Sequence, residues 1–386
     1  MLAPHERGAG MALVSIATFN ANNFYLRYKF AKSYPGGEQN AAAVVAGTEA
    51  RLGYLPGLSF GKYGKEQFVI WDGTRRELAA RALKAPDGKL PDVLCFQEVE
   101  NIHAIRLFNQ EHLGGHYPYS LLIDGYDPRN IDVGVLSRFP IVGARSHIDD
   151  REPDGRWVFS RDCLEVEVDI PGKRNLFLFL NHLKSKFARK EAGESQADLE
   201  AKMLAGHQRR KAQAQAVRAI VHARFQANDT ESLYAGGGDF NDTPLSPWVA
   251  PLMSSPRLVD VVSLHRAVND RWTYWWRSKN QATQIDHVLG SRALRDAVDA
   301  AVLSDSKYTP HIERMGLAYR DLNASGEVLP RQANVISVDD DGVTPVPAGA
   351  PAPSKVDFDF PRYAEVIESW RNNISDHCPV KVWLKL

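Results

Sequence analysis

The stretch ISDHCPVKVWLKL, residues 374–386, joins a strand to two chemically active side chains. From Pro379 onward apolar residues alternate with other residues, which is typical of a β-strand. Adjacent side chains on a regular strand point to opposite faces, so Asp376 and His377 can share one site only if the chain bends before the strand. The stretch therefore predicts a strand, and a bend in front of it that presents a carboxylate and an imidazole together.

Short apolar runs rich in β-forming residues recur along the whole chain, and each predicts a strand. The other runs lie at residues 13–19, 92–99, 132–137, 164–170, 176–183, 272–276 and 286–290. Helical patterns occupy residues 75–84, 101–113 and 208–225. Many strands with few helices indicate an α/β fold in which two packed sheets are covered by outer helices.

Three segments, residues 34–68, 184–207 and 304–373, look like insertions in this framework. The third contains VDDDGVTPVPAGAPAPS, whose Pro, Gly and Ala content resists packing, so we expect a mobile loop or lid. A chain of 386 residues can form one or two domains, but no linker separates two cores. We expect a single domain over residues 11–386, after a disordered tail at residues 1–10.

The overall composition argues against several protein classes. The 47 basic residues balance the 47 acidic ones, so any phosphate binding must come from a local site. Three cysteines without CxxC spacing suggest neither a disulfide framework nor a zinc knuckle. The chain shows no signal-like apolar segment and no long apolar window. We expect a cytoplasmic monomer with no membrane association and no evident protein partner.

Oxygen-bearing side chains stand at or near the ends of predicted strands, and two more follow a run of three glycines. They are Asn20 and Asn22 in TFNANN, Glu98 in FQEVEN, Asp239 and Asn241 in GGGDFND, Asp286 in QIDHV, and Asp376 in ISDHC. Oxygen ligands suit a hard cation such as Mg²⁺, with Mn²⁺ as a substitute, whereas zinc prefers nitrogen and sulfur. The pattern predicts a magnesium site with one or two ions.

Structural explanations exist for each of these side chains. Asn20 alone is typical of a turn residue or backbone cap, and AGGGDFND is equally consistent with a glycine-rich turn that ends in an Asx motif. Glu98 ends an apolar run where the chain should be partly buried, so its carboxylate needs a partner or a metal.

Three basic or imidazole side chains have the chemistry to contact a phosphate. His182 ends a continuous apolar strand and Lys184 follows on the same face, although a satisfied buried histidine is the commoner outcome. Arg129 could clamp a phosphate or pair with a neighbouring aspartate. The aromatic run WTYWW, residues 272–276, could stack against a base or line a substrate pocket, although alternating aromatic residues in a strand more often belong to the core.

Taken in order, TFNANN, QEVEN, NHLKS, GDFND, QIDHV and SDHCPV resemble the endonuclease/exonuclease/phosphatase family, and the resemblance covers nearly the whole chain from Met11. It implies a four-layered α/β/β/α sandwich of two facing, mainly antiparallel sheets, with the active site at one edge. By the same resemblance, Glu98, Asn20 and Asp376 are expected to bind the metal.

The resemblance also implies catalytic roles. Asp239 and Asn241 match the pair that positions the attacking water, and His377 matches the general base or transition-state stabiliser. Asp286 matches the carboxylate that orients this histidine, and His182 matches a second histidine of the deoxyribonuclease I-like branch. Arg129 and Lys184 are the expected phosphate contacts.

The function predicted from these residues is Mg²⁺-dependent hydrolysis of phosphodiester bonds, with nucleic acid as the expected substrate. The alternative is a phosphatase or phosphodiesterase that acts on small phosphorylated metabolites or lipid headgroups. A remote alternative is a noncatalytic binding scaffold, against which the full set of metal and base residues argues.

Overall fold

The computed structural model of the chain describes residues 13–24, 29–30, 68–69, 73–276, 281–315, 334–335 and 374–386. The expected tail at residues 1–10 lies outside these ranges. So do almost all of the expected insertion at 34–68 and most of the one at 304–373.

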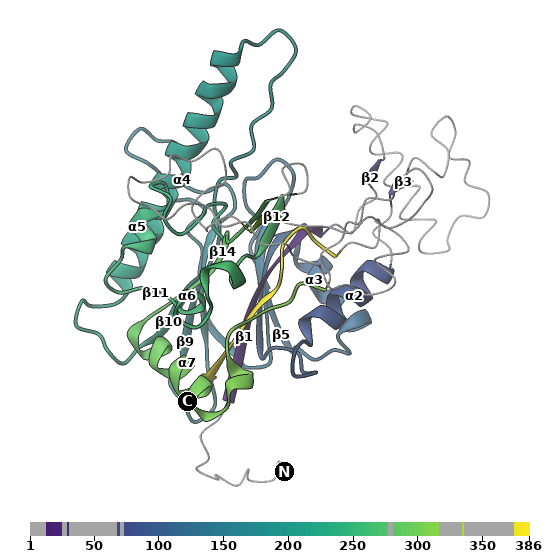
Figure 1. The fold of residues 1–386 in the computed structure, drawn as a ribbon, viewed down its shortest axis with the longest axis vertical. Coiled ribbons are helices and arrows are strands. Elements are labelled where there is room, and N and C mark those ends of the chain that lie inside the picture. Colours follow the sequence, from purple (N-terminus) through teal and green to yellow (C-terminus); the bar gives the residue numbers. More distant parts are fainter. Residues whose placement is uncertain are drawn as a thin grey trace, which may run out of the picture.

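A first six-stranded sheet contains both the start and the end of the described chain (Figure 1). Its order is β15 (His311–Ile312), β17 (Val380–Lys385), β1 (Leu13–Phe24), β4 (Val93–Val99), β6 (Asp132–Ser137) and β5 (Tyr119–Leu122). Strand β1 runs parallel to β4, and the other neighbours in this sheet are antiparallel.

A second six-stranded sheet has the same mixed character. Its order is β11 (Val259–Asp260), β14 (Asp286–Gly290), β10 (Leu233–Asp239), β9 (Leu176–His182), β8 (Cys163–Val168) and β7 (Ile141–Arg145). Strands β9 and β10 are parallel, and the remaining pairs are antiparallel. Smaller sheets join β12 (Tyr274–Trp276), β13 (Gln281–Thr283) and β16 (Asn334–Val335), and β2 (Lys29–Phe30) with β3 (Phe68–Val69).

Side-chain alternation along the strands builds the layers. On β1, Ile16 points into a core between the two sheets, together with Leu178 of β9. The next residue, Ala17, faces an outer core that also contains Phe108. Because strand side chains alternate between faces, one strand can contribute to both cores. A third core lies on the outer face of the second sheet.

Helices cover the two outer faces and complete the four layers. Helices α2 (Gly73–Leu83) and α3 (Ile102–His112) pack on the first sheet, and α4 (Gln196–Arg224) and α5 (Ala250–Met253) pack on the second. The remaining helical segments are α6 (Val261–His265), η3 (Val268–Asp270), α7 (Arg292–Ser304) and η5 (Ser306–Tyr308). The predicted α/β/β/α sandwich is confirmed.

Helix α4 begins earlier than the sequence pattern predicted. Residues 196–207, which we expected to belong to a charged insertion, form its first turns, and Figure 1 shows this part extending beyond the sandwich. A capping box starts the helix, because Ser195 accepts from the N–H of Asp198 while Asp198 accepts from the N–H of Ser195. Most of the following residues favour helix, and they outweigh the cost of Gly206.

The directions of the strands bring the ends of six strands together at one edge of the sandwich. The carboxyl ends of the parallel pairs β1–β4 and β9–β10 lie beside the amino ends of β17 and β14, which run the opposite way. A side-chain hydrogen bond joins the two sheets there, since Asn20 Nδ2 donates to Asp239 Oδ2 over 2.9 Å. Most of the predicted site residues therefore meet at this edge. No helix within the described ranges is long and apolar enough to cross a membrane.

Candidate active site

A pocket of about 430 Å³ opens at this edge. Its lining is Asn22, Asn23, Glu98, Arg129, Arg161, His182, Ser185, Lys186, Phe187, Asp239, Asn241, Tyr274, Thr283, Ile285, Asp376 and His377. Carboxylates, imidazoles and guanidinium groups thus meet in one cavity.

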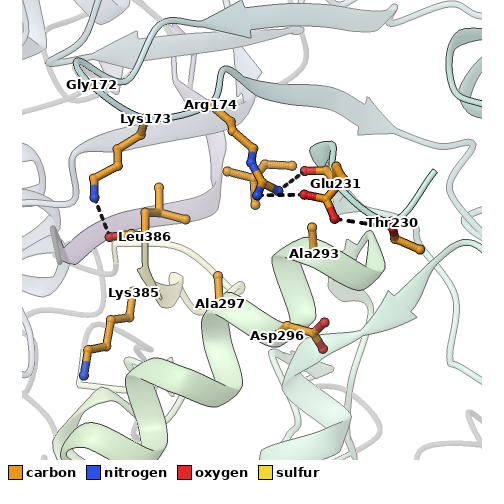
Figure 2. Close-up of a pocket in the computed structure, with 11 residues that line it drawn as sticks. Gly172, Lys173, Arg174, Thr230, Glu231, Ala293, Asp296, Ala297, Lys385 and Leu386 are labelled. Carbon is orange, nitrogen blue, oxygen red and sulfur yellow. Dashed lines mark hydrogen bonds and ion pairs between the residues drawn. The ribbon is translucent and has the colours of Figure 1, made fainter.

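A larger pocket, of about 630 Å³, is lined by residues of the β8–β9 turn, α7 and the end of β17, and is shown in Figure 2. Several of its charged groups contact their neighbours: Arg174 lies 2.7 Å from Glu231, and Lys173 donates to the Leu386 carbonyl. No histidine is part of its lining. The pocket at the strand ends, although smaller, is the one with the chemistry of a catalytic site.

Glu98 is aimed into the pocket by an irregularity of β4. The pairing of β4 with β6 shifts between Phe96 and Val99, and Glu98 adopts a left-handed backbone conformation with φ of 60°. A bulge of this kind re-aims a side chain that a regular strand would direct elsewhere. The N–H of Asn23 donates to Glu98 Oε2 over 2.9 Å and fixes the carboxylate.

Unusual backbone conformations gather around the same cavity. The described non-glycine residues with positive φ are Asn22, Asn23, Glu98, Asn130 and Asn241. Four of them line the pocket, and the fifth follows Arg129, which also lines it. Such conformations cost about 1 kcal/mol or more each and persist where the surrounding structure imposes them.

Glu98 and Asp376 form the most suitable pair for a hard cation. Burial raises the pKa of Glu98, and the nearby charge of Asp376 raises this pKa further. Two carboxylates held close together in a partly buried pocket repel each other unless a cation lies between them. Their oxygen atoms match the ligands that Mg²⁺ prefers, so these residues fit the implied metal.

A close approach between two strands places Asp239 in the site. At Gly238 φ is +125°, and a Cβ atom there would lie 2.1 Å from the Asn181 carbonyl oxygen. Only glycine can bring β10 this close to β9. The segment LYAGGGD is therefore a strand, and an Asx turn follows it, since the N–H of Asn241 donates to Asp239 Oδ1 over 2.7 Å.

The buried carboxylate of Asp239 is surrounded by nitrogen atoms. Asn20 and Asn241 each donate a side-chain N–H to Oδ2, over 2.9 and 3.0 Å. His182 Nε2 lies 3.4 Å and His377 Nε2 3.8 Å from the same oxygen. Burial raises the pKa of Asp239 to about 7, although the charge of His377 opposes the shift.

His377 is held by Asp286. Its Nδ1 lies 2.9 Å from Asp286 Oδ2, and Thr273 donates its hydroxyl to the same oxygen over 2.7 Å. An ionised carboxylate only accepts, so Nδ1 is the donor and Nε2 faces Asp239. Burial alone would lower the pKa of His377, but the charges of Asp286 and Asp239 raise it well above its usual value.

Asp239, Asp286 and His377 also form a cluster whose ligand atoms lie within 4.8 Å of one another. Such a group is chemically able to hold a metal ion. However, Asp286 Oδ2 already accepts from both Thr273 and His377. This double engagement favours a histidine–carboxylate pair for Asp286 over the role of a primary metal ligand.

His182 and Lys184 follow the end of β9 but have different positions. His182 lines the pocket and is buried, and burial together with the charge of Arg161 lowers its pKa well below the usual value. The ring is therefore neutral. Lys184 does not line the pocket. Burial and the charges of Arg161 and Arg129 lower the pKa of Lys184.

Two arginines form a cationic wall of the pocket. Asp127 lies 2.9 Å from Arg161 Nε and 3.2 Å from Arg129 Nε. Arg161 is almost fully buried, whereas the Arg129 side chain is 49 % exposed. The neighbouring aspartate that we considered as the partner of Arg129 is thus present, and it holds the guanidinium group at the pocket.

The candidate site residues of the sequence analysis and the pocket lining overlap in eight residues: Asn22, Glu98, Arg129, His182, Asp239, Asn241, Asp376 and His377. Asn20 and Asp286 stand behind the lining and position Asp239 and His377. Arg161 and Phe187 were not predicted as site residues. The signal for Arg161 was a charged residue just before an apolar strand, where burial requires a partner.

The aromatic run at residues 272–276 divides between core and pocket. Trp272 and Trp275 are buried in the core between the sheets. Tyr274 lines the pocket, with its ring centroid 4.8 Å from that of His377. The core interpretation is therefore confirmed for Trp272 and Trp275, Tyr274 lines a pocket, and stacking against a base stays a prediction.

The sequence of residues 17–311 matches the model of the endonuclease/exonuclease/phosphatase family. This match spans most of the chain, and with the fold and the pocket it places the protein in that family of metal-dependent phosphoesterases. No curated protein sequence matches the chain.

Solved structures resemble the chain only distantly. A beta toxin of Staphylococcus aureus is 12 % identical, with a TM-score of 0.46 over 95 % of this chain and 98 % of that one. A truncated TDP2 of Caenorhabditis elegans is 13 % identical, with a TM-score of 0.48 over 97 % and 98 %. An endonuclease/exonuclease/phosphatase protein of Beutenbergia cavernae is 14 % identical, with a TM-score of 0.47 over 97 % and 72 %.

Proposed function

We propose that this phosphoesterase hydrolyses phosphodiester bonds of nucleic acid with Mg²⁺ as its cofactor. The observation that carries the proposal is the division of charge within one pocket. Glu98 and Asp376 supply carboxylates for a cation, while Arg129 and Arg161 supply guanidinium groups for phosphate.

The residues of the chain have distinct roles in this proposal. Glu98 and Asp376 hold Mg²⁺, whose contribution when bound is to neutralise charge on the phosphoryl oxygens. Asp239, fixed by donors from Asn20 and Asn241, holds the attacking water. These contacts preorganise the carboxylate before the substrate arrives, which lowers the reorganisation needed in the reaction.

The histidines manage protons and developing charge. Asp286 keeps the Nδ1 proton of His377 in place, so Nε2 is the atom that holds or transfers a proton at the scissile phosphate. Neutral His182 contributes a hydrogen bond without adding charge.

We infer a polynucleotide substrate because the cationic wall is open to solvent. Arg129 is half exposed, so a phosphate that belongs to a long chain can reach it without entering a closed cavity. A backbone of regularly spaced phosphates offers repeated contacts to such a wall.

A substrate panel with purified protein tests the proposal. It contains single- and double-stranded DNA, RNA, phosphorylated metabolites and sphingomyelin vesicles, each with Mg²⁺ or with chelator. We expect polynucleotide cleavage that requires Mg²⁺ and is lost in His377→Ala and Glu98→Gln. Hydrolysis confined to metabolites or lipid headgroups would instead support the alternative substrate class, and full activity in both variants would refute the assignment of the site.

A further inference from the structure

An exposed aromatic side chain stands at the rim of the catalytic pocket. Phe187 lines the cavity, yet 75 % of its surface is accessible to solvent. Large apolar side chains are normally buried, because exposure forgoes the gain from leaving water. What sets Phe187 apart from other exposed apolar side chains is its place in the lining of a pocket that also contains phosphate-binding groups, where its ring is accessible to a ligand.

The backbone before Phe187 is held against α4 by hydrogen bonds. Arg210 of α4 is fully buried and donates to the Lys184 carbonyl over 2.7 Å. Gln213 accepts from the N–H of Lys184 over 2.7 Å. The N–H of Phe187 donates to the Ser185 hydroxyl over 3.1 Å. The segment is thus anchored to α4 while its phenylalanine ring stays in solvent.

A second anchor links the same segment to the catalytic strand end. Lys186 Nζ lies 2.7 Å from Asp242 Oδ1, and Asp242 follows the Asp239–Asn241 pair in sequence. Asp242 is fully buried, and its other oxygen lies 2.8 Å from Arg210 Nε. The position of Phe187 is therefore coupled to the groups that are expected to hold the attacking water.

We propose that Phe187 is a specificity-determining residue that stacks on a nucleobase next to the scissile phosphate. The inference rests on the proposed nuclease function. A flat ring at the rim, with the guanidinium wall of Arg129 and Arg161 in the same pocket, matches a nucleotide, in which a planar base adjoins an anionic phosphate. Tyr274 adds a second aromatic ring to the lining.

Equilibrium binding tests this proposal without depending on turnover. Calorimetry with Mg²⁺ present would compare thymidine 5′-monophosphate, methyl phosphate and phosphocholine on the wild type and on Phe187→Ala. We expect Phe187→Ala to weaken binding of the nucleotide by roughly fivefold or more and to leave methyl phosphate unchanged. Phe187→Trp should retain tight nucleotide binding, whereas Phe187→Leu should behave like the alanine variant.

Leu303 supplies the matched control, since it is 87 % exposed on α7 and does not line the pocket. Leu303→Ala should bind every ligand as the wild type does. Three results for Phe187→Ala would overturn the proposal. They are an unchanged affinity for the nucleotide, an equal loss of affinity for the nucleotide and for methyl phosphate, and a loss of affinity confined to phosphocholine. Wild-type affinity for the nucleotide in Phe187→Leu would also overturn the proposal, because an alkyl group cannot replace a stacking ring. A protein that binds as expected but cleaves no nucleic acid would contradict only the proposed function.

Discussion

Asp286 Oδ2 lies 2.9 Å from His377 Nδ1, although 91 residues separate the two in sequence. The contact joins the start of β14 in one sheet to the bend before β17 in the other. It requires both sheets to be in place, so the imidazole of His377 is oriented only in the folded sandwich.

Asp286→Asn should lower kcat on the order of 10²-fold or more, because the amide no longer stabilises a charged imidazole or fixes its tautomer. KM should change much less, since Asp286 does not line the pocket. Steady-state kinetics over a range of pH would measure both effects. The surface pair His265–Asp299, also at 2.9 Å, offers a control, and Asp299→Asn should leave kcat unchanged. Normal kcat in Asp286→Asn would refute the orienting role.

Glu98→Gln should remove Mg²⁺ binding, because it replaces the charged ligand with a neutral amide. Calorimetry should detect heat of binding for the wild type and none for the variant. Mg²⁺ should raise the melting temperature of the wild type only, since a ligand stabilises the state that binds it. Glu231→Gln, in the other pocket, is the control and should respond to Mg²⁺ as the wild type does. Equal Mg²⁺ affinity in both variants would exclude Glu98 as a ligand.

Arg210→Met should destabilise the fold by about 3 kcal/mol or more, because Asp242 would lose one of its two cationic partners in a buried position. Urea denaturation would measure the change in free energy of unfolding. Arg218→Met, in the same helix but only partly buried, should cost much less. If the two substitutions cost the same, the buried ion pair would have no special role in stability.

The pH dependence of stability should contain a contribution from Asp132. Burial raises the pKa of this aspartate from 3.8 to about 7, even though it accepts from the Gly125 N–H. The folded state therefore binds the proton more tightly than the unfolded state. Stability from this group is present at low pH and is lost as the pH rises towards about 7.

Asp132→Asn removes that dependence, because an amide oxygen can still accept from Gly125 but does not ionise. Relative to the wild type, the variant should gain stability above pH 7, by up to about 4 kcal/mol. Below pH 4 the wild type and Asp132→Asn should have similar free energies of unfolding. Urea titrations at several pH values would measure the difference, with the exposed Asp296→Asn as a control that follows the wild type. If the difference in free energy of unfolding between the wild type and Asp132→Asn did not vary with pH, the raised pKa of Asp132 would be contradicted.

The sequence was sufficient for most strands because these strands are buried on both faces, so each of them appears in the sequence as a short, nearly continuous apolar run. Strands β6 and β14 begin and end where the apolar runs do. Strand β10 was not predicted, since its three glycines have low strand propensity and are explained only by the contact with Asn181. That contact belongs to the tertiary structure and has no local signal.

The candidate site was predictable where a side chain sits at a strand end and the family motif is intact. The bend before β17 is confirmed, since Asp376 and His377 line one pocket and the strand begins at Val380. Arg161 was not predicted because its role depends on Asp127, and the sequence alone does not show that the two meet. Substrate, localisation and oligomeric state remain predictions.

Arg129→Ala should raise KM for polynucleotides by roughly tenfold, while kcat changes less, because the half-exposed guanidinium acts on binding of the phosphate. The salt dependence of KM should also become shallower, since one fewer cation contacts the backbone. Arg156→Ala is the matched control: its side chain is 64 % exposed and also pairs with an aspartate, yet it does not line the pocket. If both variants keep the wild-type KM and salt dependence, Arg129 serves only as the ion-pair partner of Asp127, and phosphate binding must rest on Arg161.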